Sequence, residues 1–281
     1  MDFPPDVFAL IRDLIYERTG LMFENKKHQF LAPRVARRVR AARCDGPRDY
    51  YQLLRYSDPD RREFQELVDE VTTNETYFFR DYPQLECFAN EVLPRVAEQK
   101  RRAGDYALNV WCACCSTGDE AYTLAIIAAA CLDDFSRWDV RVLATDIDTK
   151  VLATARAAVY GERNLKDVAP AYRSRFFVPG RDGHRVADPI RRMVAFEQVN
   201  LMDADRMGRQ RAYDFVFCRN ALIYFDDDSR RRALGYFHDA LVPGGFVFLG
   251  HSESVGRISA AFQPVQFGTG GVVYQRPPRR A

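Results

Sequence analysis

Two adjacent acids stand where a short apolar segment passes into an amphipathic helix. Residues 110–122 read V-W-C-A-C-C-S-T-G-D-E-A-Y, so that Ser116-Thr117-Gly118 is followed directly by Asp119 and Glu120. A strand, a tight turn of small residues and a helix form a nucleotide-type binding site, in which the ligand lies against the turn. Carboxylates at this place repel a pyrophosphate and attract a cation. The segment therefore predicts a cofactor with positive charge, such as the sulfonium of S-adenosylmethionine, rather than a dinucleotide.

Further polar residues follow two other apolar runs. Asp146 ends residues 140–146, where an acid at a strand tip accepts hydrogen bonds from ribose hydroxyls. Its neighbour Asp148 is expected to cap the next helix. Residues 213–218 lead into Arg219-Asn220 and then Tyr224, which would reach a ligand crevice from the carboxyl end of a strand. A turn beside a half-buried aromatic residue is the alternative interpretation.

The segment 72–81, T-T-N-E-T-Y-F-F-R-D, joins two compositionally different parts of the chain. Its three consecutive aromatic residues followed by Arg80 and Asp81 suit a structured loop that caps a pocket. Arg80 could hold a carboxylate through two parallel hydrogen bonds.

Three cysteines, Cys112, Cys114 and Cys115, raise the question of a metal. Metal sites usually recruit ligands from a second segment with a characteristic spacing, and the sequence offers none. We interpret these cysteines as small buried residues and predict no metal site.

The periodicity predicts a helical first part and an α/β second part. The predicted strands are residues 107–113, 140–145, 194–199, 213–218, 245–250 and 271–275, the last two being candidates for antiparallel pairing. The predicted helices are residues 120–132, 149–159 and 227–241. This alternation indicates a doubly wound, Rossmann-like sheet. The expected divisions are a helical domain (1–75), a linker segment and helix (76–104), and the sheet domain (105–281), with an inserted hairpin subdomain (160–193).

A basic run lies inside the helical part. Residues 26–43 contain seven basic residues and no acid, and Arg34, Arg37 and Arg38 share one helical face. Such a run is most often a solvated face. The functional alternative is a docking surface for an acidic helix.

Composition excludes several classes of function. The 281 residues are 47% hydrophobic and 28% charged, as in an ordinary globular protein, and the net charge of +2 gives no global argument for nucleic acid. No apolar run approaches the roughly 20 residues of a membrane span, and no leader opens the chain. We therefore expect a cytoplasmic monomer that neither enters a membrane nor binds nucleic acid.

Five motifs together resemble one family. N-E-T-Y-F-F-R-D, W-C-A-C-C-S-T-G-D-E-A-Y, A-T-D-I-D-T-K-V-L, F-C-R-N-A-L-I-Y-F and G-H-S-E are similar in order and spacing to the chemotaxis methyltransferase (CheR) family. That family comprises S-adenosylmethionine-dependent protein-glutamate O-methyltransferases acting on chemoreceptors. The resemblance spans nearly the whole chain and implies a methyltransferase sheet with a small helical domain in front.

The resemblance also implies roles for individual residues. The implied cofactor contacts are Asn74, Thr76, Arg80, Glu120 (methionine moiety), Asp146 (ribose), and Asn200, Leu201, Arg219 and Asn220 along the adenine and methionine ends. Arg80 and Tyr224 would lie nearest the transferred methyl group, and S-adenosylhomocysteine would be the product. The basic face of Arg34, Arg37 and Arg38 would dock the cytoplasmic helical region of chemoreceptors.

The sequence departs from the family pattern W-S-A-G-C-S-T-G-E-E-P-Y at several positions. Asp119 stands for a glutamate, Ala121 for a proline, and Cys112 and Cys114 for smaller residues, whereas Glu120 is kept, so we expect cofactor binding to be retained. Residues 178–184 are a shortened version of the glycine-rich loop with which some members grip a receptor tether. Tether binding is not predicted.

The implied reaction needs no general base, because a glutamate carboxylate with a reference pKa of about 4.3 is already ionised near neutral pH. Arg80 and Tyr224 are therefore expected to orient groups rather than to transfer protons. Two alternatives come from other classes. One is a non-catalytic module that keeps the cofactor fold and binds receptors, and the other is a methyltransferase acting on RNA or a small molecule.

Overall fold

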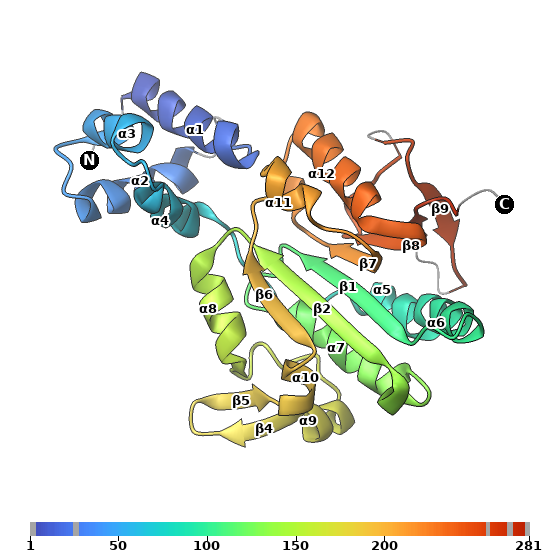
Figure 1. Ribbon diagram of the computed structural model, residues 1–281. Coiled ribbons are helices and arrows are strands. Elements are labelled where there is room, and N and C mark those ends of the chain that lie inside the picture. Colours follow the sequence, from blue (N-terminus) through green and yellow to red (C-terminus); the bar gives the residue numbers. More distant parts are fainter. Residues whose placement is uncertain (1–3, 25–27, 257–258, 269–271, 279–281) are drawn as a thin grey trace.

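The computed structural model describes residues 4–24, 28–256, 259–268 and 272–278 (Figure 1). Lys26 and Lys27 of the basic run, and Gly271 of a predicted strand, lie outside these residues. The described N-terminal part consists of helices α1 (Pro5–Thr19), α2 (His28–Ala41), α3 (Pro47–Tyr56) and α4 (Arg62–Val71). They enclose an apolar core of their own, which includes Val7, Ile11, Leu14, Leu31, Val35, Leu67 and Val68.

The second part is built on a seven-stranded sheet in the order β6-β2-β1-β7-β8-β10-β9. The strands are β1 (Ala107–Ala113), β2 (Asp139–Asp146), β6 (Val194–Gln198), β7 (Tyr213–Cys218), β8 (Leu241–Leu249), β9 (Gln263–Gln266) and β10 (Val272–Gln275). The pairs β6–β2, β2–β1, β1–β7 and β7–β8 are parallel, and β10 is antiparallel to both β8 and β9. The doubly wound sheet predicted from the sequence is confirmed.

The strand predicted at 245–250 belongs to β8, which pairs antiparallel with β10, as expected for the two candidates, and parallel with β7 on its other side. Strand β9 was not predicted. Its four residues, Q-P-V-Q, are largely exposed and show neither an apolar run nor an alternation of apolar and polar residues.

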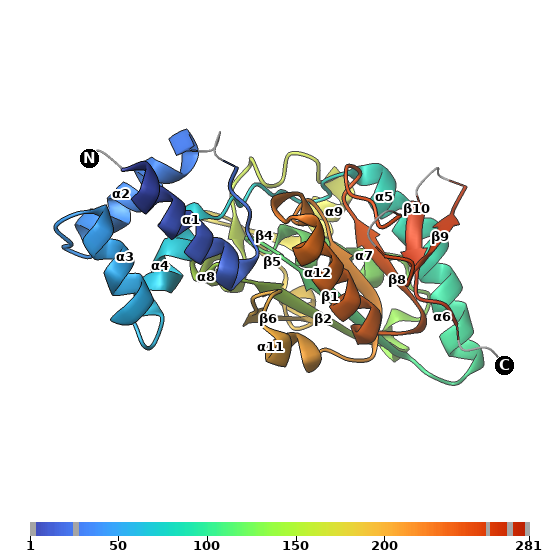
Figure 2. The ribbon, with the colours of Figure 1, turned by 90° about the horizontal axis from the view of Figure 1, so that it is seen from above.

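Helices cover both faces of the sheet (Figures 1 and 2). One face packs against α5 (Tyr82–Cys87), the π-helical turn Phe88–Val92, α6 (Leu93–Arg102), α7 (Asp119–Cys131) and α8 (Thr149–Ala157). The other packs against α11 (Ala204–Gly208) and α12 (Asp227–Ala240). Alternate residues of a strand point to opposite faces, so Phe215 and Phe217 join the first core while Val216 and Cys218 join the second.

The insertion forms a small antiparallel sheet in the order β3-β5-β4. It comprises β3 (Val159–Tyr160), α9 (Pro170–Phe176), β4 (Phe177–Gly180), β5 (Gly183–Val186) and α10 (Asp188–Arg191). Gly180 pairs with Gly183 across a two-residue turn, which is the hairpin predicted for this region. The Tyr160 hydroxyl donates to the Thr117 carbonyl at 2.7 Å, so the insertion supports the turn after β1.

The helical domain lies against the carboxyl edge of the sheet (Figure 2). Met22 N–H donates to the Tyr224 carbonyl at 2.8 Å, and the Asn200 side-chain amide donates to the Arg18 carbonyl at 2.7 Å. The Tyr16 hydroxyl donates to Asp226 Oδ2 at 2.5 Å. In a doubly wound sheet, ligands bind where the strand order reverses, here between β1 and β7. The segment after α1 therefore covers the place where a ligand is expected.

Candidate functional site

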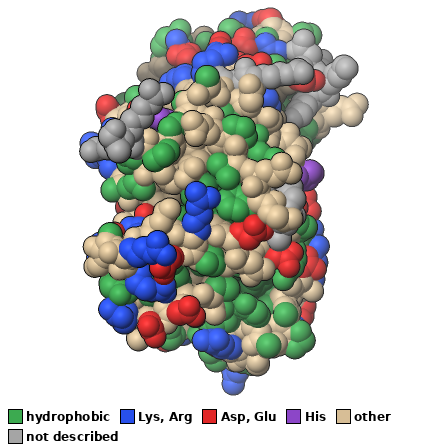
Figure 3. Space-filling model, turned by 90° about the vertical axis from the view of Figure 1, so that its right-hand side faces the viewer, with side chains coloured by type: hydrophobic (Ala, Val, Ile, Leu, Met, Phe, Trp, Pro, Cys, Tyr) green, Lys and Arg blue, Asp and Glu red, His purple; other side chains and the backbone are tan. Residues whose placement is uncertain are grey.

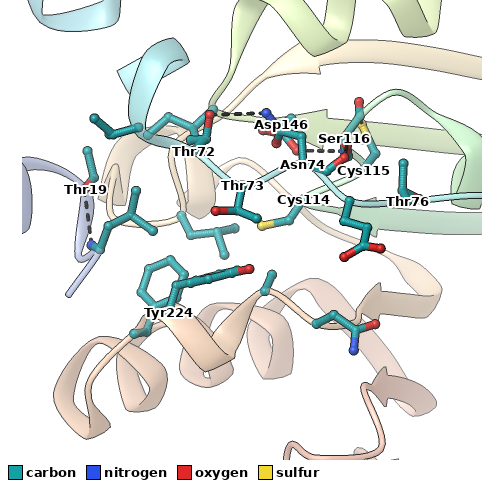
Figure 4. Close-up of a pocket in the computed structure, with 18 of the residues that line it drawn as sticks. Thr19, Thr72, Thr73, Asn74, Thr76, Cys114, Cys115, Ser116, Asp146 and Tyr224 are labelled. Carbon is teal, nitrogen blue, oxygen red and sulfur yellow. Dashed lines mark hydrogen bonds between the residues drawn. The ribbon is translucent and has the colours of Figure 1, made fainter. Parts of the chain in front are cut away.

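A cavity of about 250 Å³ lies at this edge, between the sheet, the linker after α4 and the segment after α1 (Figure 4). Its walls include every cofactor-contact and catalytic residue expected from the sequence, namely Asn74, Thr76, Arg80, Glu120, Asp146, Asn200, Leu201, Arg219, Asn220 and Tyr224. These residues come from five separate segments of the chain. The fold therefore brings them together, although their individual contacts with a ligand stay predictions.

Asp146 ends β2 with a buried carboxylate. Its Oδ2 accepts Ser116 N–H at 2.8 Å and its Oδ1 accepts Asp148 N–H at 3.0 Å. Burial raises the pKa of Asp146 to about 6, against the opposing effect of these backbone donors. A carboxylate has about four acceptor positions, so each oxygen keeps capacity toward the cavity. Two neighbouring hydroxyl donors are the group this arrangement fits best.

Asp148 organises the linker from behind the cavity. One oxygen accepts Lys150 N–H at 2.8 Å and Val151 N–H at 3.1 Å, which confirms that it caps α8. The other oxygen accepts the Thr72 hydroxyl and the Asn74 side-chain amide, both at 2.7 Å. Asn74 therefore lines the cavity with its amide nitrogen already bonded to Asp148.

Glu120 and Arg219 form an ion pair in the cavity wall, and their side chains are 11% and 3% exposed. Arg219 also donates to the carbonyl of Arg80 at 2.8 Å, which holds the linker against the end of β7. The Cys112 thiol donates to the second Glu120 oxygen at 3.3 Å, and burial raises the pKa of this thiol. The Glu120 carboxylate thus has a fixed orientation and a compensated charge.

Asp119, the acid next to Glu120, has a different role. Asp119 is fully buried and accepts hydrogen bonds from the Thr117 hydroxyl at 2.6 Å and the Asn164 amide at 2.8 Å. It is not part of the cavity wall. The expectation that both acids face the cofactor is wrong for Asp119, because its side chain accepts from the Thr117 hydroxyl in the preceding turn and from Asn164 of the insertion.

Gly118 is also needed in the turn after β1, but not for the expected contact with a ligand. Its φ is +88°, and a Cβ added there would lie 2.9 Å from Ala155 Cβ and 3.1 Å from the Tyr160 hydroxyl. Gly118 does not line the cavity. The glycine permits close packing of the turn on α8 and the insertion, rather than approach of a ligand.

Arg80 and Tyr224 approach the cavity from different sides. Arg80 donates to the carbonyl of Glu75 within its own loop, and its guanidinium carbon lies 5.8 Å from the centre of the Tyr77 ring. Tyr224 ends a 3₁₀ turn (Leu222–Tyr224), and its side chain lies across the cavity from Asp146 and Ser116 (Figure 4).

One wall was missed by the sequence analysis. It is formed by five residues between the end of α1 and the start of α2, namely Thr19, Leu21, Met22, Phe23 and Phe30. The sequence offers no pattern for a ligand there: Gly20 ends α1 with a φ of +73°, and a glycine after a helix signals only where the helix stops. Cys114 and Cys115, which were expected only to be small and buried, also contribute to the wall.

The predicted docking arginines lie on α2, where α4 supplies the acids that the basic run lacks. Arg38 pairs with Glu63 at 2.7 Å and is 16% exposed, whereas Arg37 pairs with Glu70 and is 51% exposed. The Arg34 guanidinium lies 3.6 Å from the centre of the Phe30 ring. Arg37 and Arg38 thus both link α2 to α4, and Arg37 is the more exposed of the two.

Comparison with known proteins agrees with this geometry. The family model "CheR methyltransferase, SAM binding domain" matches residues 74–270, and "CheR methyltransferase, all-alpha domain" matches residues 6–72. The chain is 36% identical over 261 residues to chemotaxis protein methyltransferase 2 of Vibrio cholerae serotype O1, covering 92% of this chain and 89% of the relative. It is 34% identical over 260 residues to the chemotaxis protein methyltransferase of Escherichia coli K12, covering 91% and 86%.

The Glu120–Arg219 pair yields a first prediction. Arg219→Met or Glu120→Gln leaves one buried polar group without its charged partner, which should lower the free energy of unfolding by about 3–5 kcal/mol. Removing both partners should cost at least about 1 kcal/mol less than the sum of the single changes. Urea unfolding of the wild type, the two single variants and the double variant measures this coupling.

Arg141→Ala, which breaks an exposed pair with Asp139, is the control and should cost at most about 1 kcal/mol. Additive effects at positions 120 and 219 would contradict the pairing.

Proposed function

Because the chain belongs to the chemotaxis methyltransferase (CheR) family, we propose that it methylates glutamate side chains of chemoreceptors. The chain is an S-adenosylmethionine-dependent methyltransferase, and the product on the receptor would be a glutamate methyl ester. The observation that carries the proposal is the single cavity that joins Asp146, the Glu120–Arg219 pair, Arg80 and Tyr224. No helix in the described part of the chain is long and apolar enough to cross a membrane. The proposal includes a monomer acting in the cytoplasm.

The walls of the cavity fit this cofactor. Asp146 has buried acceptor oxygens suited to ribose hydroxyls, and Ile147, Val199 and Leu201 give an apolar wall beside it that suits adenine. The Glu120 carboxylate suits an ammonium group of the methionine moiety. Asn200 uses its side chain to hold Arg18 and Met202, so it would shape this end of the cavity rather than bind strongly.

The mechanism rests on orientation. When bound, S-adenosylmethionine supplies an electrophilic methyl group on its sulfonium sulfur and becomes S-adenosylhomocysteine as a carboxylate oxygen takes the methyl group. The receptor carboxylate is already ionised, so no residue has to remove a proton. Arg80 and Tyr224 would orient the carboxylate, and alignment of two reactants can supply roughly 7–11 kcal/mol. Leu21, Met22 and Phe23 close one side of the cavity and would exclude water.

Receptor docking is assigned to the helical domain. The exposed Arg37 and Arg40 extend along one side of α2, and Arg34 lies one turn before Arg37. An acidic helical segment of a receptor is the partner that fits this charge. An RNA substrate has less support, because on the face seen in Figure 3 the Lys and Arg side chains are interspersed with Asp and Glu.

The first functional prediction concerns Asp146. Asp146→Ala should weaken binding of S-adenosylhomocysteine by at least about 100-fold, because two hydrogen bonds to a charged acceptor at about 1.5–3 kcal/mol each are lost. The ionised carboxylate is the binding form, so wild-type affinity should be full well above the pKa of about 6 and fall as the pH drops through it. Calorimetric titration at several pH values measures both effects. Glu162→Ala, an exposed acid of the insertion, serves as the control. Equal affinity at pH 5 and pH 7.5 would remove Asp146 from the ribose site.

The second prediction concerns methyl transfer itself. Transfer of labelled methyl groups to a cytoplasmic receptor fragment should give base-labile esters, and Arg80→Ala should lower kcat by about 100-fold through lost alignment. Tyr224→Phe should lower kcat without changing the shape of the pH profile. A bell-shaped wild-type profile whose limbs disappear in Tyr224→Phe would instead assign proton transfer to Tyr224. Cofactor binding without any transfer would favour the non-catalytic receptor-binding module.

The third prediction concerns docking. Arg37→Glu should raise the KM for the receptor fragment about 5–10-fold, more strongly at low salt, because it reverses an exposed charge on the docking face. It should leave kcat and cofactor affinity unchanged. Arg141→Glu makes the same charge change on an exposed residue of β2 and should leave KM unaltered. Equal KM values for the two variants would place docking elsewhere.

A further inference from the structure

Glu253, the last residue of the G-H-S-E motif, has no role in the mechanism above. It lies in the loop after β8, and its carboxylate accepts three backbone N–H groups. Oε2 accepts Gly250 N–H at 2.6 Å and Asn220 N–H at 2.9 Å, and Oε1 accepts Ile223 N–H at 3.1 Å. Burial raises the pKa of this carboxyl group, against these donors. Only the bond to Gly250 lies within the same loop.

The other two bonds reach the segment that carries the reactive end of the cavity. Asn220 and Tyr224 line the cavity, whereas Glu253 does not. The segment between them leaves the sheet at Cys218 and is not part of any sheet ladder. Asn220 has a φ of +58°, a left-handed conformation that asparagine adopts more readily than most other residues with a side chain.

Close packing at Gly250 also indicates that the loop after β8 holds the turn after β7. A Cβ added at Gly250 would lie 2.8 Å from Glu253 Oε2 and 2.9 Å from the backbone nitrogen of Asn220. The loop after β8 therefore needs a glycine at this position to bring its carboxylate against the turn. A carboxylate that bound only its own loop would not require Gly250 to lie this close to Asn220.

We propose that Glu253 is a positioning residue, which fixes the turn 220–224 so that Asn220 and Tyr224 face the cavity in the orientation that methyl transfer needs. It acts through Asn220 N–H and Ile223 N–H, from outside the cavity wall. The inference rests on the proposed function for its kinetic consequence. Its structural part, the restraint on the turn, does not depend on that function.

Glu253→Gln tests the inference with little change of shape. The remaining oxygen can still accept from Asn220 and Gly250, but the new amide group meets Ile223 N–H as a second donor, so that bond is lost. We expect kcat to fall at least tenfold, while the Kd for S-adenosylhomocysteine changes less than threefold. Amide hydrogen exchange of a peptide covering residues 219–225 should become faster.

Asp214→Asn is the matched control. Asp214 is also a buried carboxylate with a pKa raised by burial, and it accepts Asn109 N–H at 2.8 Å at the opposite end of β7. It should lower stability but leave kcat and exchange in 219–225 unchanged. If Glu253→Gln keeps kcat within twofold, or leaves the exchange of this peptide unaltered, the inference is overturned.

Failure of the proposed function and failure of the variant to fold can each be told apart from failure of the inference. If the wild type transfers no methyl group, the proposed function fails, and hydrogen exchange alone decides whether Glu253 restrains the turn. If Glu253→Gln does not fold, Glu253→Asp, which keeps the charge but withdraws it by one methylene, is judged by the same criteria for kcat, Kd and exchange.

Discussion

A carboxylate taken out of water needs hydrogen-bond donors, and the edge of this sheet buries several carboxylates at once. Asp146 and Glu253 take backbone N–H groups, Asp148 takes donors from the linker, and Glu120 takes Arg219. Each of these partners lies in a different segment. The hydrogen bonds to these acids therefore hold the linker, the turn after β1 and the turn after β7 together as one wall. The cavity is the space that this wall encloses.

The helical domain is a structural part of the same site. Leu21, Met22 and Phe23 close the cavity, and Met22 holds the backbone of Tyr224. The same domain carries the basic face of α2 on its outer side. In the proposed function, receptor docking and closure of the cavity would therefore depend on one folded unit.

Local patterns carried much of the prediction. Short apolar runs located β1 and β7 to the residue, and Asp148 was recognised as the cap of α8 from its position alone. The adjacent acids pointed to a cationic cofactor, and the motif resemblance supplied the site residues. These features depend on neighbours within one helical turn or one strand, so that their spacing in the chain contains the information.

What the sequence determined by itself was the order of strands and helices, the family and its cofactor. The tertiary structure decided which acid of the pair faces the cavity, which acids of α4 pair with Arg37 and Arg38, and which residues form the wall above the strand ends. The bond between Asn200 and Arg18 joins residues 182 positions apart, and that between Glu253 and Asn220 joins residues 33 apart. Such partners meet only when the sheet and the helical domain have packed, because a hydrogen bond is set by distance in space and leaves no periodicity along the chain.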